Sequence, residues 1–468
     1  MNENNNKITS TLINLVSNFE GLIQKGQIGS YNKEEYTQLI NFYIANNNID
    51  KAMDIVDIAI EQYKYITNFY LLKGNLLLQL HQPEDALKYI EHCENLSPYD
   101  FEVRLLKAKS LSMTGDIDKS WAELNELKTF SNLNYVVEVN IIKSYIYEYT
   151  GEFEKMFDIL KETLILDPIN IEALHKMNIA TLFTRKYEES ASFHLKLIED
   201  SPYNYMAWFN LGQIYSIISQ YEHAIDCLEY SFLINPGFEE GYLEYTDLCL
   251  QVGKYRNAAV VYEEYISKFE ADSEIYLNLI NAYIHLKDYK KAKKYAFKSI
   301  KLDSYNDEAY FMLGEIFKKQ GKWEKALNAY QKAIEIEKER EEYYNAIAEM
   351  YIKLNDLILA EKYYDKLIEL NSPEEKYYLN YILFLIENKK YKKADKILEI
   401  SEDLVYCAYF NYLKAVICFK TNNKKEALLL LDNALSENID EYIKIFEIAP
   451  ELKFDKEVNS MINYYKNQ

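Results

Sequence analysis

The segment MAWFNLGQIYSIISQYEHAIDCLEYSFLINP, residues 206–236, decides the fold. Its first half places large side chains at Leu211 and Tyr215, the spacing of one face of an α-helix. A small residue, Gly212, lies beside them, and a second, Ala224, follows twelve positions later. Two antiparallel helices approach closely only where both present small side chains at their crossing. The segment therefore predicts a helical hairpin whose helices cross at these two small residues.

The same hairpin recurs along the chain with a period of 34 residues. Forward steps of 34 from Ala224 reach five further alanines, and a step of 33 reaches a sixth. Backward steps of 34, one of them lengthened to 36, reach five more positions, of which only Met156 is not small. The small residues of this register are Ala52, Ala86, Ser120, Ser190, Ala224, Ala258, Ala292, Ala326, Ala360, Ala394 and Ala427. We call the twelve positions anchors, and they predict about twelve hairpins.

Three further registers agree with the anchors. A Gly, Ala or Ser lies twelve residues before seven of them, at Gly74, Ala108, Ser144, Gly212, Gly314, Ala348 and Ala415. A Pro follows four of them by twelve residues, at Pro98, Pro168, Pro202 and Pro236, where it ends the second helix without costing an internal hydrogen bond. Turn glycines are expected between the two helices, at Gly115, Gly151, Gly253 and Gly321.

Segment 206–236 resembles the tetratricopeptide-repeat consensus. The matching residues are Trp208, Leu211, Gly212, Tyr215, Ala224 and Pro236. The segment EAYFMLGEIFKKQGKWEKALNAYQKAIEIE, residues 308–337, is similar to it through Tyr310, Leu313, Gly314, Gly321, Ala326, Tyr330 and Ala333. The resemblance covers about residues 33–440, is weakest near 137–204 and 405–440, and extends to multi-repeat members from the bacterial cytosol. It implies an all-α fold, an α-solenoid that winds as a right-handed superhelix of about twelve hairpins.

The resemblance also predicts the domain organisation. Residues 1–32 form a polar N-terminus with one amphipathic capping helix over residues 7–25, residues 33–440 form the repeat array, and residues 441–468 form C-terminal capping helices around Pro450. Caps are needed because a terminal repeat otherwise exposes the hydrophobic face on which the next repeat would stack.

In this family the first helix of each hairpin lines the inner, concave surface, so the resemblance implies a binding groove. At the fifth and ninth positions of the first helices, the expected groove residues are Leu71, Asn75, Leu105, Ile141, His175, Phe209, Leu243, Leu277, Asn281, Phe311 and Leu379. At the second position the expected acidic edge consists of Glu102, Glu138, Glu172, Glu240, Glu274, Glu308 and Glu342. The set of Lys, Asn and Arg with which chaperone-binding members hold a terminal carboxylate is absent from any three consecutive hairpins.

An apolar floor edged by carboxylates suits a partner protein segment with basic and hydrophobic residues. Two simpler explanations remain open. A Glu at the start of a helix is favoured by the helix dipole whatever it faces, and an inward apolar residue can pack against the neighbouring repeat.

Charge and cysteine content limit the partners and the compartment. The chain has 53 Lys and Arg against 74 Asp and Glu, a net charge of −21, which disfavours nucleic acid and anionic membranes. No apolar run is long enough to span a bilayer, and nothing near the N-terminus resembles a signal peptide. Five cysteines without a CxxC pair are typical of a reducing compartment. We expect a cytoplasmic protein.

No catalytic, cofactor or metal motif stands out. Phosphate-binding glycine loops and the GxSxG elbow are absent, and the six histidines show no paired ligand spacing. His194 is expected in the core and His175 on the groove face. The stripe formed by Lys291, Lys294, Lys298 and Lys301 is expected to be a solvated outer face, with an anion-binding stripe as the alternative.

The sequence therefore predicts a non-catalytic scaffold or adaptor that binds protein segments, with no cofactor and no metal. The first alternative is a structural solenoid that associates with itself, so homo-oligomerisation stays open. A regulatory sensor coupled to DNA is a third alternative, disfavoured because the residues before the first hairpin are too few and too polar for a DNA-reading module.

Overall fold

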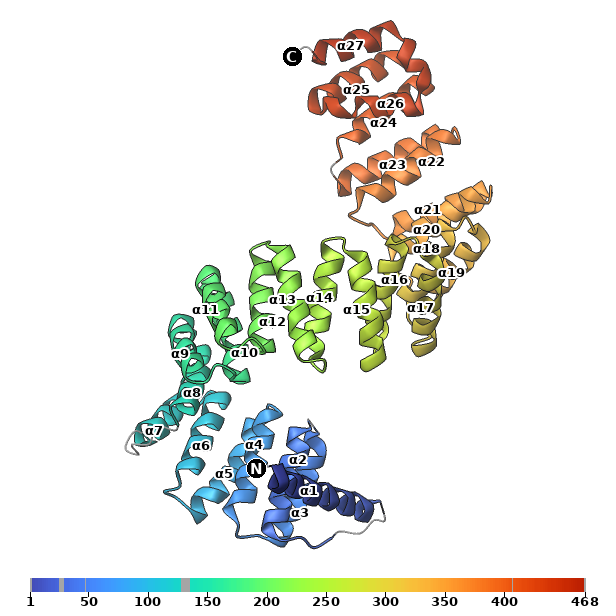
Figure 1. The fold of residues 1–468 in the computed structure, drawn as a ribbon. Coiled ribbons are helices and arrows are strands. Elements are labelled where there is room, and N and C mark those ends of the chain that lie inside the picture. The colour runs from blue at the N-terminus through green and yellow to red at the C-terminus, as the bar shows by residue number, and fades with distance from the viewer. Residues whose placement is uncertain (1, 25–28, 47, 128–134, 406, 467–468) are drawn as a thin grey trace. The chain divides into compact units, whose positions relative to one another are not determined.

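The computed structural model describes residues 2–24, 29–46, 48–127, 135–405 and 407–466, with side chains from residue 12 onward except at 403. All regular elements in these ranges are helices (Figure 1). They are α1 (Asn2–Ile23), α2 (Lys33–Ala45), α3 (Ile49–Gln62), α4 (Thr67–Gln79), α5 (Pro83–Leu96), α6 (Phe101–Thr114), α7 (Ile117–Leu127), α8 (Val136–Tyr149), α9 (Phe153–Leu166), α10 (Ile171–Thr184), α11 (Tyr187–Asp200), α12 (Tyr205–Ile217), α13 (Tyr221–Ile234), α14 (Glu239–Gln251), α15 (Tyr255–Lys268), α16 (Ser273–His285), α17 (Tyr289–Leu302), α18 (Asp307–Lys319), α19 (Trp323–Ile336), α20 (Glu341–Lys353), α21 (Leu357–Glu369), α22 (Glu375–Glu387), α23 (Tyr391–Leu404), α24 (Tyr409–Lys420), α25 (Lys424–Glu437), the 3-10 helix η2 (Ile439–Glu441), α26 (Tyr442–Ile448), the 3-10 helix η3 (Pro450–Phe454) and α27 (Lys456–Lys466). The predicted all-α fold is confirmed.

The chain divides into two compact units, residues 1–248 and 249–468. Within the first unit consecutive helices pack as antiparallel pairs, such as α4 with α5, α6 with α7 and α12 with α13. Within the second unit α16 pairs with α17, α18 with α19, and α20 with α21 in the same way. Each unit is therefore a stack of helical hairpins, the architecture of a helical solenoid.

The anchors occupy one structural position. Each of the twelve is the fourth residue of a second helix, from Ala52 in α3 to Ala427 in α25, and each is 0% exposed, Met156 included. Ser120 adds a hydrogen bond to this contact, because its Oγ donates to the carbonyl oxygen of Ala108 across the α6–α7 crossing at 2.8 Å. A hydroxyl is tolerated there because it finds a buried acceptor on the partner helix.

The glycine before the anchor is required by close packing. A Cβ added at Gly212 in α12 would lie 2.8 Å from Cγ of Leu228 and 3.2 Å from the carbonyl oxygen of Ala224, both in α13. No real Cβ fits at 2.8 Å without a shift of its neighbour. The crossing expected from the sequence therefore brings the two backbones together at these residues.

The turn inside each hairpin uses a left-handed residue five positions before the anchor. All eleven described residues at this position have positive φ, between 56° and 85°. Four of them are glycines, Gly115, Gly151, Gly253 and Gly321, as the sequence indicates. The other seven are His81, Arg185, Ser219, Lys287, Asn355, Lys389 and Asn422. Residue 47, the twelfth, lies outside the described residues. The turn conformation is thus kept where its usual glycine is missing.

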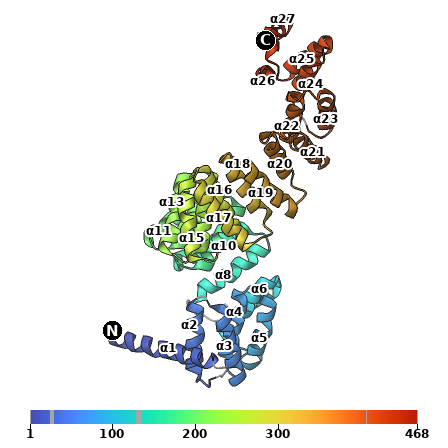
Figure 2. The same cartoon turned by 90° about the vertical axis from the view of Figure 1, so that its right-hand side faces the viewer.

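Additional helices lie at both ends of the chain. At the N-terminus α1 meets the first hairpin (Figure 2), where Phe19 is buried and the Glu20 carboxylate accepts hydrogen bonds from Tyr43 Oη at 3.0 Å and Lys51 Nζ at 3.2 Å. The helix expected over residues 7–25 ends at Ile23, and residues 25–28 lie outside the described part.

After α25 the chain forms η2, α26, η3 and α27. Val458 and Ile462 of α27 are buried in the same hydrophobic cluster as Leu431 of α25. The ion pair between Lys424 and Asp455, at 2.8 Å, joins the start of α25 to the residue before α27. The C-terminal helices therefore pack on the last hairpin.

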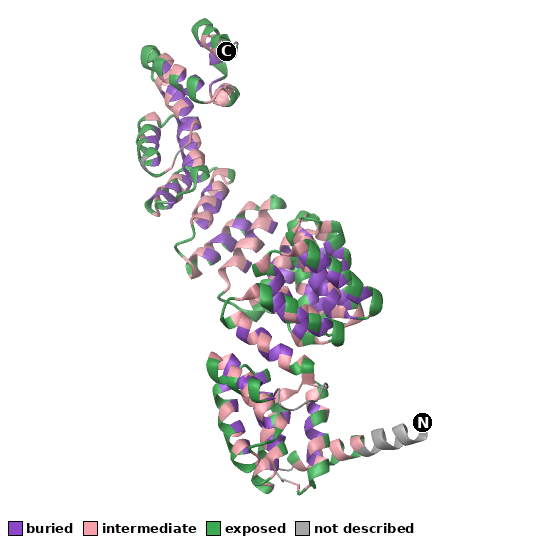
Figure 3. Cartoon of the chain, turned by 90° about the vertical axis from the view of Figure 1, so that its left-hand side faces the viewer, coloured by how far each residue is buried: buried purple, intermediate pink, exposed green. Residues whose placement is uncertain are grey.

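Buried residues lie on the helix faces that meet neighbouring helices, and exposed residues on the turns and free faces (Figure 3). In the part of the chain that the structure describes, no helix has the combined length and apolar character needed to cross a bilayer.

Candidate functional site

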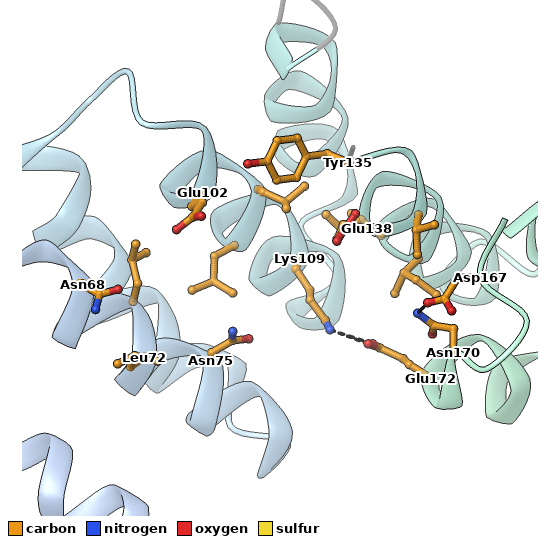
Figure 4. Close-up of a pocket in the computed structure, with 16 residues that line it drawn as sticks. Asn68, Leu72, Asn75, Glu102, Lys109, Tyr135, Glu138, Asp167, Asn170 and Glu172 are labelled. Carbon is orange, nitrogen blue, oxygen red and sulfur yellow. Dashed lines mark hydrogen bonds and ion pairs between the residues drawn. The ribbon is translucent and has the colours of Figure 1, made fainter. Parts of the chain in front are cut away.

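One cavity of the first unit lies between the first helices of four consecutive hairpins, α4, α6, α8 and α10 (Figure 4). We call it the first cavity; its volume is about 420 Å³. Its apolar wall consists of Leu71, Leu72, Leu105, Leu106, Val137, Ile141 and Ile142. These side chains recur because one face of every first helix carries apolar residues at helical spacing.

The polar lining of the first cavity is predominantly acidic. Four carboxylates, those of Glu102, Glu138, Asp167 and Glu172, line it together with a single ammonium group, Lys109. Asn68, Asn75, Tyr135 and Asn170 complete the polar lining. The cavity therefore combines a hydrophobic wall with an excess of negative charge.

An ion pair crosses the cavity (Figure 4). Lys109 Nζ of α6 lies 2.8 Å from Glu172 Oε1 of α10, so the pair joins two first helices with α8 between them in the chain. Tyr145 of α8 donates its hydroxyl to the same Glu172 oxygen at 2.7 Å. Burial, and then the negative charge of Glu172, raise the pKa of Tyr145 well above its usual value, so the phenol stays protonated.

Glu102 and Glu138 differ from Glu172 in having no cationic partner among the described residues. Both lie in the first turn of a helix, α6 and α8 respectively, where the helix dipole favours a carboxylate. The dipole explains why a Glu is stable there. It supplies no cationic side chain, and both carboxylates line the cavity.

A second cavity of about 590 Å³ lies on the other side of the ion pair and shares Asn75, Lys109 and Glu172 with the first. His81, His175 and Lys176 also line it. The Lys176 ammonium is almost fully buried, forms an ion pair with Glu148, and lies 3.5 Å from the ring centroid of Tyr145. Burial lowers the pKa of Lys176, against the opposing effect of Glu148. The Lys109–Glu172 pair therefore separates two neighbouring hollows.

Eight of the residues expected in the groove line these two cavities. Leu71, Asn75, Leu105, Ile141, Glu102, Glu138 and Glu172 line the first, and His175 lines the second together with Asn75 and Glu172. They come from four different hairpins. The first and the last of them, residues 71 and 175, lie 104 positions apart in the chain.

The remaining expected residues lie in other surroundings. Phe209 and Leu277 are only 7% and 9% exposed, and Phe209 packs edge-on against Phe238 with the ring centroids 5.0 Å apart. Phe311 is half-buried between the rings of Tyr330 and Tyr343. Leu243, Asn281, Leu379, Glu308 and Glu342 are half-buried, whereas Glu240 and Glu274 are exposed. For Phe209, Leu277 and Phe311, packing against neighbouring helices accounts for the apolar side chain.

Several lining residues have no counterpart in the sequence prediction. Tyr145 is the ninth residue of its unit, the position at which Asn75 and Lys109 also occur, so the same register indicates it. Asp167 and Asn170 belong to a helix cap: Asn170 accepts from the backbone N–H of Ala173 at 2.9 Å and donates to Asp167 at 3.0 Å. The Asn170 cap can be recognised in the sequence as the start of α10, but it does not indicate that these residues line a cavity.

Known proteins resemble the chain at the level of single repeats. The sequence profile of the family described as "Tetratricopeptide repeat" matches residues 67–100, 207–238, 273–306 and 341–373, and the profile described as "TPR repeat" matches residues 314–355. Four of these five segments begin at or within two residues of the start of a first helix, and the fifth begins inside α18. No curated protein matches the chain.

Solved structures are similar to this chain over most of their own length. "Crystal structure of MamA" is 22% identical, covers 34% of this chain and 94% of that one, and has a TM-score of 0.33. "Crystal structure of YrrB: a TPR protein with an unusual peptide-binding site" is 17% identical, covers 39% and 94%, and has a TM-score of 0.33. "Crystal structure of APC/C hetero-tetramer Cut9-Hcn1" is 13% identical, covers 80% and 87%, and has a TM-score of 0.34.

The family profiles match hairpins in both units, and the anchors hold one buried position in every second helix that contains them. The chain is a tetratricopeptide-repeat protein.

Proposed function

We propose that the protein is a non-catalytic scaffold that binds a partner protein segment with basic and hydrophobic residues in the first cavity. The observation that carries this proposal is the apolar wall combined with two carboxylates, Glu102 and Glu138, that have no cationic partner among the described residues. A Lys or Arg of the partner supplies the missing positive charge, and an adjacent aliphatic side chain covers Leu105 and Ile141.

Two interactions supply the affinity. Burial of apolar surface contributes about 25 cal/mol per Å² before the costs of association. Each partly exposed ion pair adds about 0.2–1 kcal/mol, so the charges contribute more to specificity for the partner than to affinity. The amides of Asn68 and Asn75 provide donors and acceptors for the backbone of an extended segment.

The test uses a fluorescent eight-residue peptide of alternating Lys and Leu and measures its anisotropy as the protein is added. The double variant Glu102→Gln, Glu138→Gln keeps side-chain size and removes both charges. We expect its affinity for the peptide to fall about three- to tenfold. The matched control is Glu34→Gln, Glu84→Gln, which changes two exposed carboxylates in the first turns of α2 and α5.

The control variant should bind as the wild type does. Equal loss in both double variants would mean that the peptide responds only to the net charge of the molecule, and the first cavity would then not be the binding site. Unchanged affinity in the Glu102 and Glu138 variant would exclude it as well.

We also propose that the scaffold works in a reducing compartment, the cytoplasm. All five cysteines are free thiols, and three are buried singly in the packed interior. Burial raises the pKa of Cys93 and of Cys227 to about 12, so these thiols are unreactive packing residues. If alkylation of the native protein modified Cys93 as fast as free cysteine, the assignment of Cys93 as a buried, unreactive thiol would be wrong.

A further inference from the structure

Helix α17 (Tyr289–Leu302) is strongly basic in an acidic protein. Its fourteen residues include six lysines and no carboxylate, whereas the whole chain carries a net charge of −21. Its buried side, Ala292, Tyr295, Ala296 and Ser299, packs within the second unit, where α17 contacts α16 and α18 (Figure 1). The lysines lie on the rest of the helix surface, together with the exposed Phe297 and Leu302.

Five residues of α17 share one exposed face. Lys290, Lys294, Phe297, Lys298 and Lys301 follow the spacing i, i+4, i+7, i+8 and i+11, which places them on one side of a helix. All five are exposed, and the aromatic ring of Phe297 is 53% exposed in the midst of the ammonium groups. The face thus presents four positive charges around a hydrophobic residue.

The four lysines of this face form no ion pair with the residues that the structure describes. Only Lys291 of the six α17 lysines forms an ion pair among the described residues, with Glu263 of α15 at 3.2 Å. Lys294 and Lys298 lie over the ring of Tyr295, at 5.0 and 5.4 Å from its centroid. Like charges four residues apart on a helix cost about 0.2–0.5 kcal/mol per pair, so the isolated face destabilises its own helix.

Other second helices are joined to the next by opposite charges where α17 is not. Lys161, the ninth residue of α9, pairs with Glu189, the third residue of α11, at 2.7 Å. The ninth residue of α17 is Phe297 and the third residue of α19 is Lys325. At the positions where a Lys–Glu pair joins α9 to α11, α17 and α19 therefore place an exposed ring and a further exposed lysine.

We propose that this surface, formed by Lys290, Lys294, Phe297, Lys298, Lys301 and Lys325 and here called the basic stripe, docks an acidic protein segment that carries an apolar residue. The carboxylates of the segment neutralise the lysines, and its apolar residue covers Phe297. The basic stripe lies on a second helix in another unit than the first cavity, so it is a second and independent docking surface.

The extent of the stripe favours a short protein segment over a polyanion. From Lys290 to Lys301 the helix rises about 17 Å, at about 1.5 Å per residue. About five residues of extended chain span the same length, at about 3.3 Å per residue. A nucleic acid or an anionic bilayer continues beyond this length, where it meets the surface of a molecule with net charge −21.

The test measures binding of a fluorescent peptide, Asp-Glu-Glu-Leu-Glu-Asp, to the full-length protein by anisotropy at low salt. Single-stranded oligo(dT) and phosphatidylserine vesicles are measured alongside. The variant Lys294→Glu, Lys298→Glu reverses two charges of the stripe, and Phe297→Ala removes the ring. The matched control Lys196→Glu, Lys338→Glu makes the same change in net charge at two exposed lysines without a described ion pair.

We expect the charge-reversal variant to bind the peptide at least tenfold more weakly and Phe297→Ala about threefold more weakly, with the control within twofold of wild type. The thermal midpoint of the charge-reversal variant should stay or rise, because like-charge repulsion on α17 is relieved. The proposal is overturned if the peptide does not bind, if the control loses as much affinity as the stripe variant, or if oligo(dT) or the vesicles bind through the same lysines more tightly than the peptide.

Discussion

The ring of Tyr330 in α19 lies directly against the backbone of Gly314 in α18. A Cβ at Gly314 would overlap the ring, with Cδ1 at 2.5 Å and Cζ at 2.9 Å, while the Tyr330 hydroxyl is fixed by donation to Glu315 at 2.5 Å. The ring cannot move away easily, because it is fully buried and held at both ends. At this crossing the glycine makes room for an aromatic side chain as well as for a backbone.

Gly314→Ala should therefore destabilise the protein, although alanine is the better helix former. We expect a loss of about 1–3 kcal/mol in the free energy of unfolding, because overpacking a filled core forces strained side chains. The measurement is urea unfolding followed by circular dichroism. Gly21→Ala is the control: nothing lies within 4 Å of a Cβ at Gly21 in α1, so this variant should gain up to about 1 kcal/mol from helix propensity. A stabilised Gly314→Ala protein would contradict the close contact.

The left-handed turn residues give a prediction of opposite sign. Lys287 and Lys389 adopt φ of 58° and 60°, a conformation that costs a residue with a Cβ about 1–2 kcal/mol. Lys287→Gly and Lys389→Gly should each stabilise the protein by about 0.5–1 kcal/mol, after the entropy that glycine loses on folding.

Thermal unfolding of both variants checks this. The control Lys196→Gly, in the interior of α11, should lose about 1 kcal/mol, because there glycine only weakens a helix. Destabilisation at Lys287 and Lys389 equal to that at Lys196 would mean that these lysines are not in the left-handed conformation.

The fold could be predicted from the sequence because its cause is local and repeated. A small side chain such as Ala224 or Ala292 is required wherever two helices cross, so the anchors alone locate the fourth residue of each second helix. The turns were predictable only in part. Glycine marks four of the eleven described left-handed turn positions that lie five residues before an anchor. Residues such as Arg185 occupy the others, because an exposed turn can bear a modest strain that leaves no sequence signal.

The candidate site was less accessible to sequence reasoning. Leu105 and Phe209 are both fifth residues of their first helices, yet Leu105 lines a cavity and Phe209 is covered by Phe238. Whether a fifth residue is exposed to a cavity or covered depends on the side chains that follow in the next hairpin. The position of a residue within its own repeat does not carry this information. The contact between Lys109 and Glu172 joins residues 63 positions apart, and no period in the sequence links them.

The pH dependence of stability should contain a contribution from His194. This side chain is 0% exposed; its Nδ1 lies 2.8 Å from the carbonyl oxygen of Ser190, and its Nε2 lies 3.2 Å from Asn210 Nδ2. Burial lowers the pKa of His194 from 6.5 to about 4, so the imidazole is neutral in the folded protein, donating from Nδ1 and accepting at Nε2.

Because the folded pKa lies below the unfolded one, the unfolded chain binds the proton first as the pH falls. The contribution of His194 is complete above about pH 6.5 and is lost progressively toward pH 4, by roughly 3 kcal/mol in total. Chemical unfolding between pH 4 and pH 7 should show a shallower pH dependence in His194→Gln than in wild type. His223→Gln, at an exposed histidine, should keep the wild-type slope. Identical slopes in all three proteins would place the His194 pKa near its ordinary value.

The ion pair between Lys109 and Glu172 should couple α6 to α10. Its side chains are 23% and 37% exposed, so solvent screens the pair in part, and we expect a coupling energy of about 0.5–1 kcal/mol from the double-mutant cycle of Lys109→Met and Glu172→Gln. The control cycle uses Asp116→Asn and Lys119→Met, a neighbouring pair that is 51% and 71% exposed and should give a coupling near zero. Equal coupling in the two cycles would mean that the bridge between α6 and α10 is not maintained in solution, and the first and second cavities would then form one open surface.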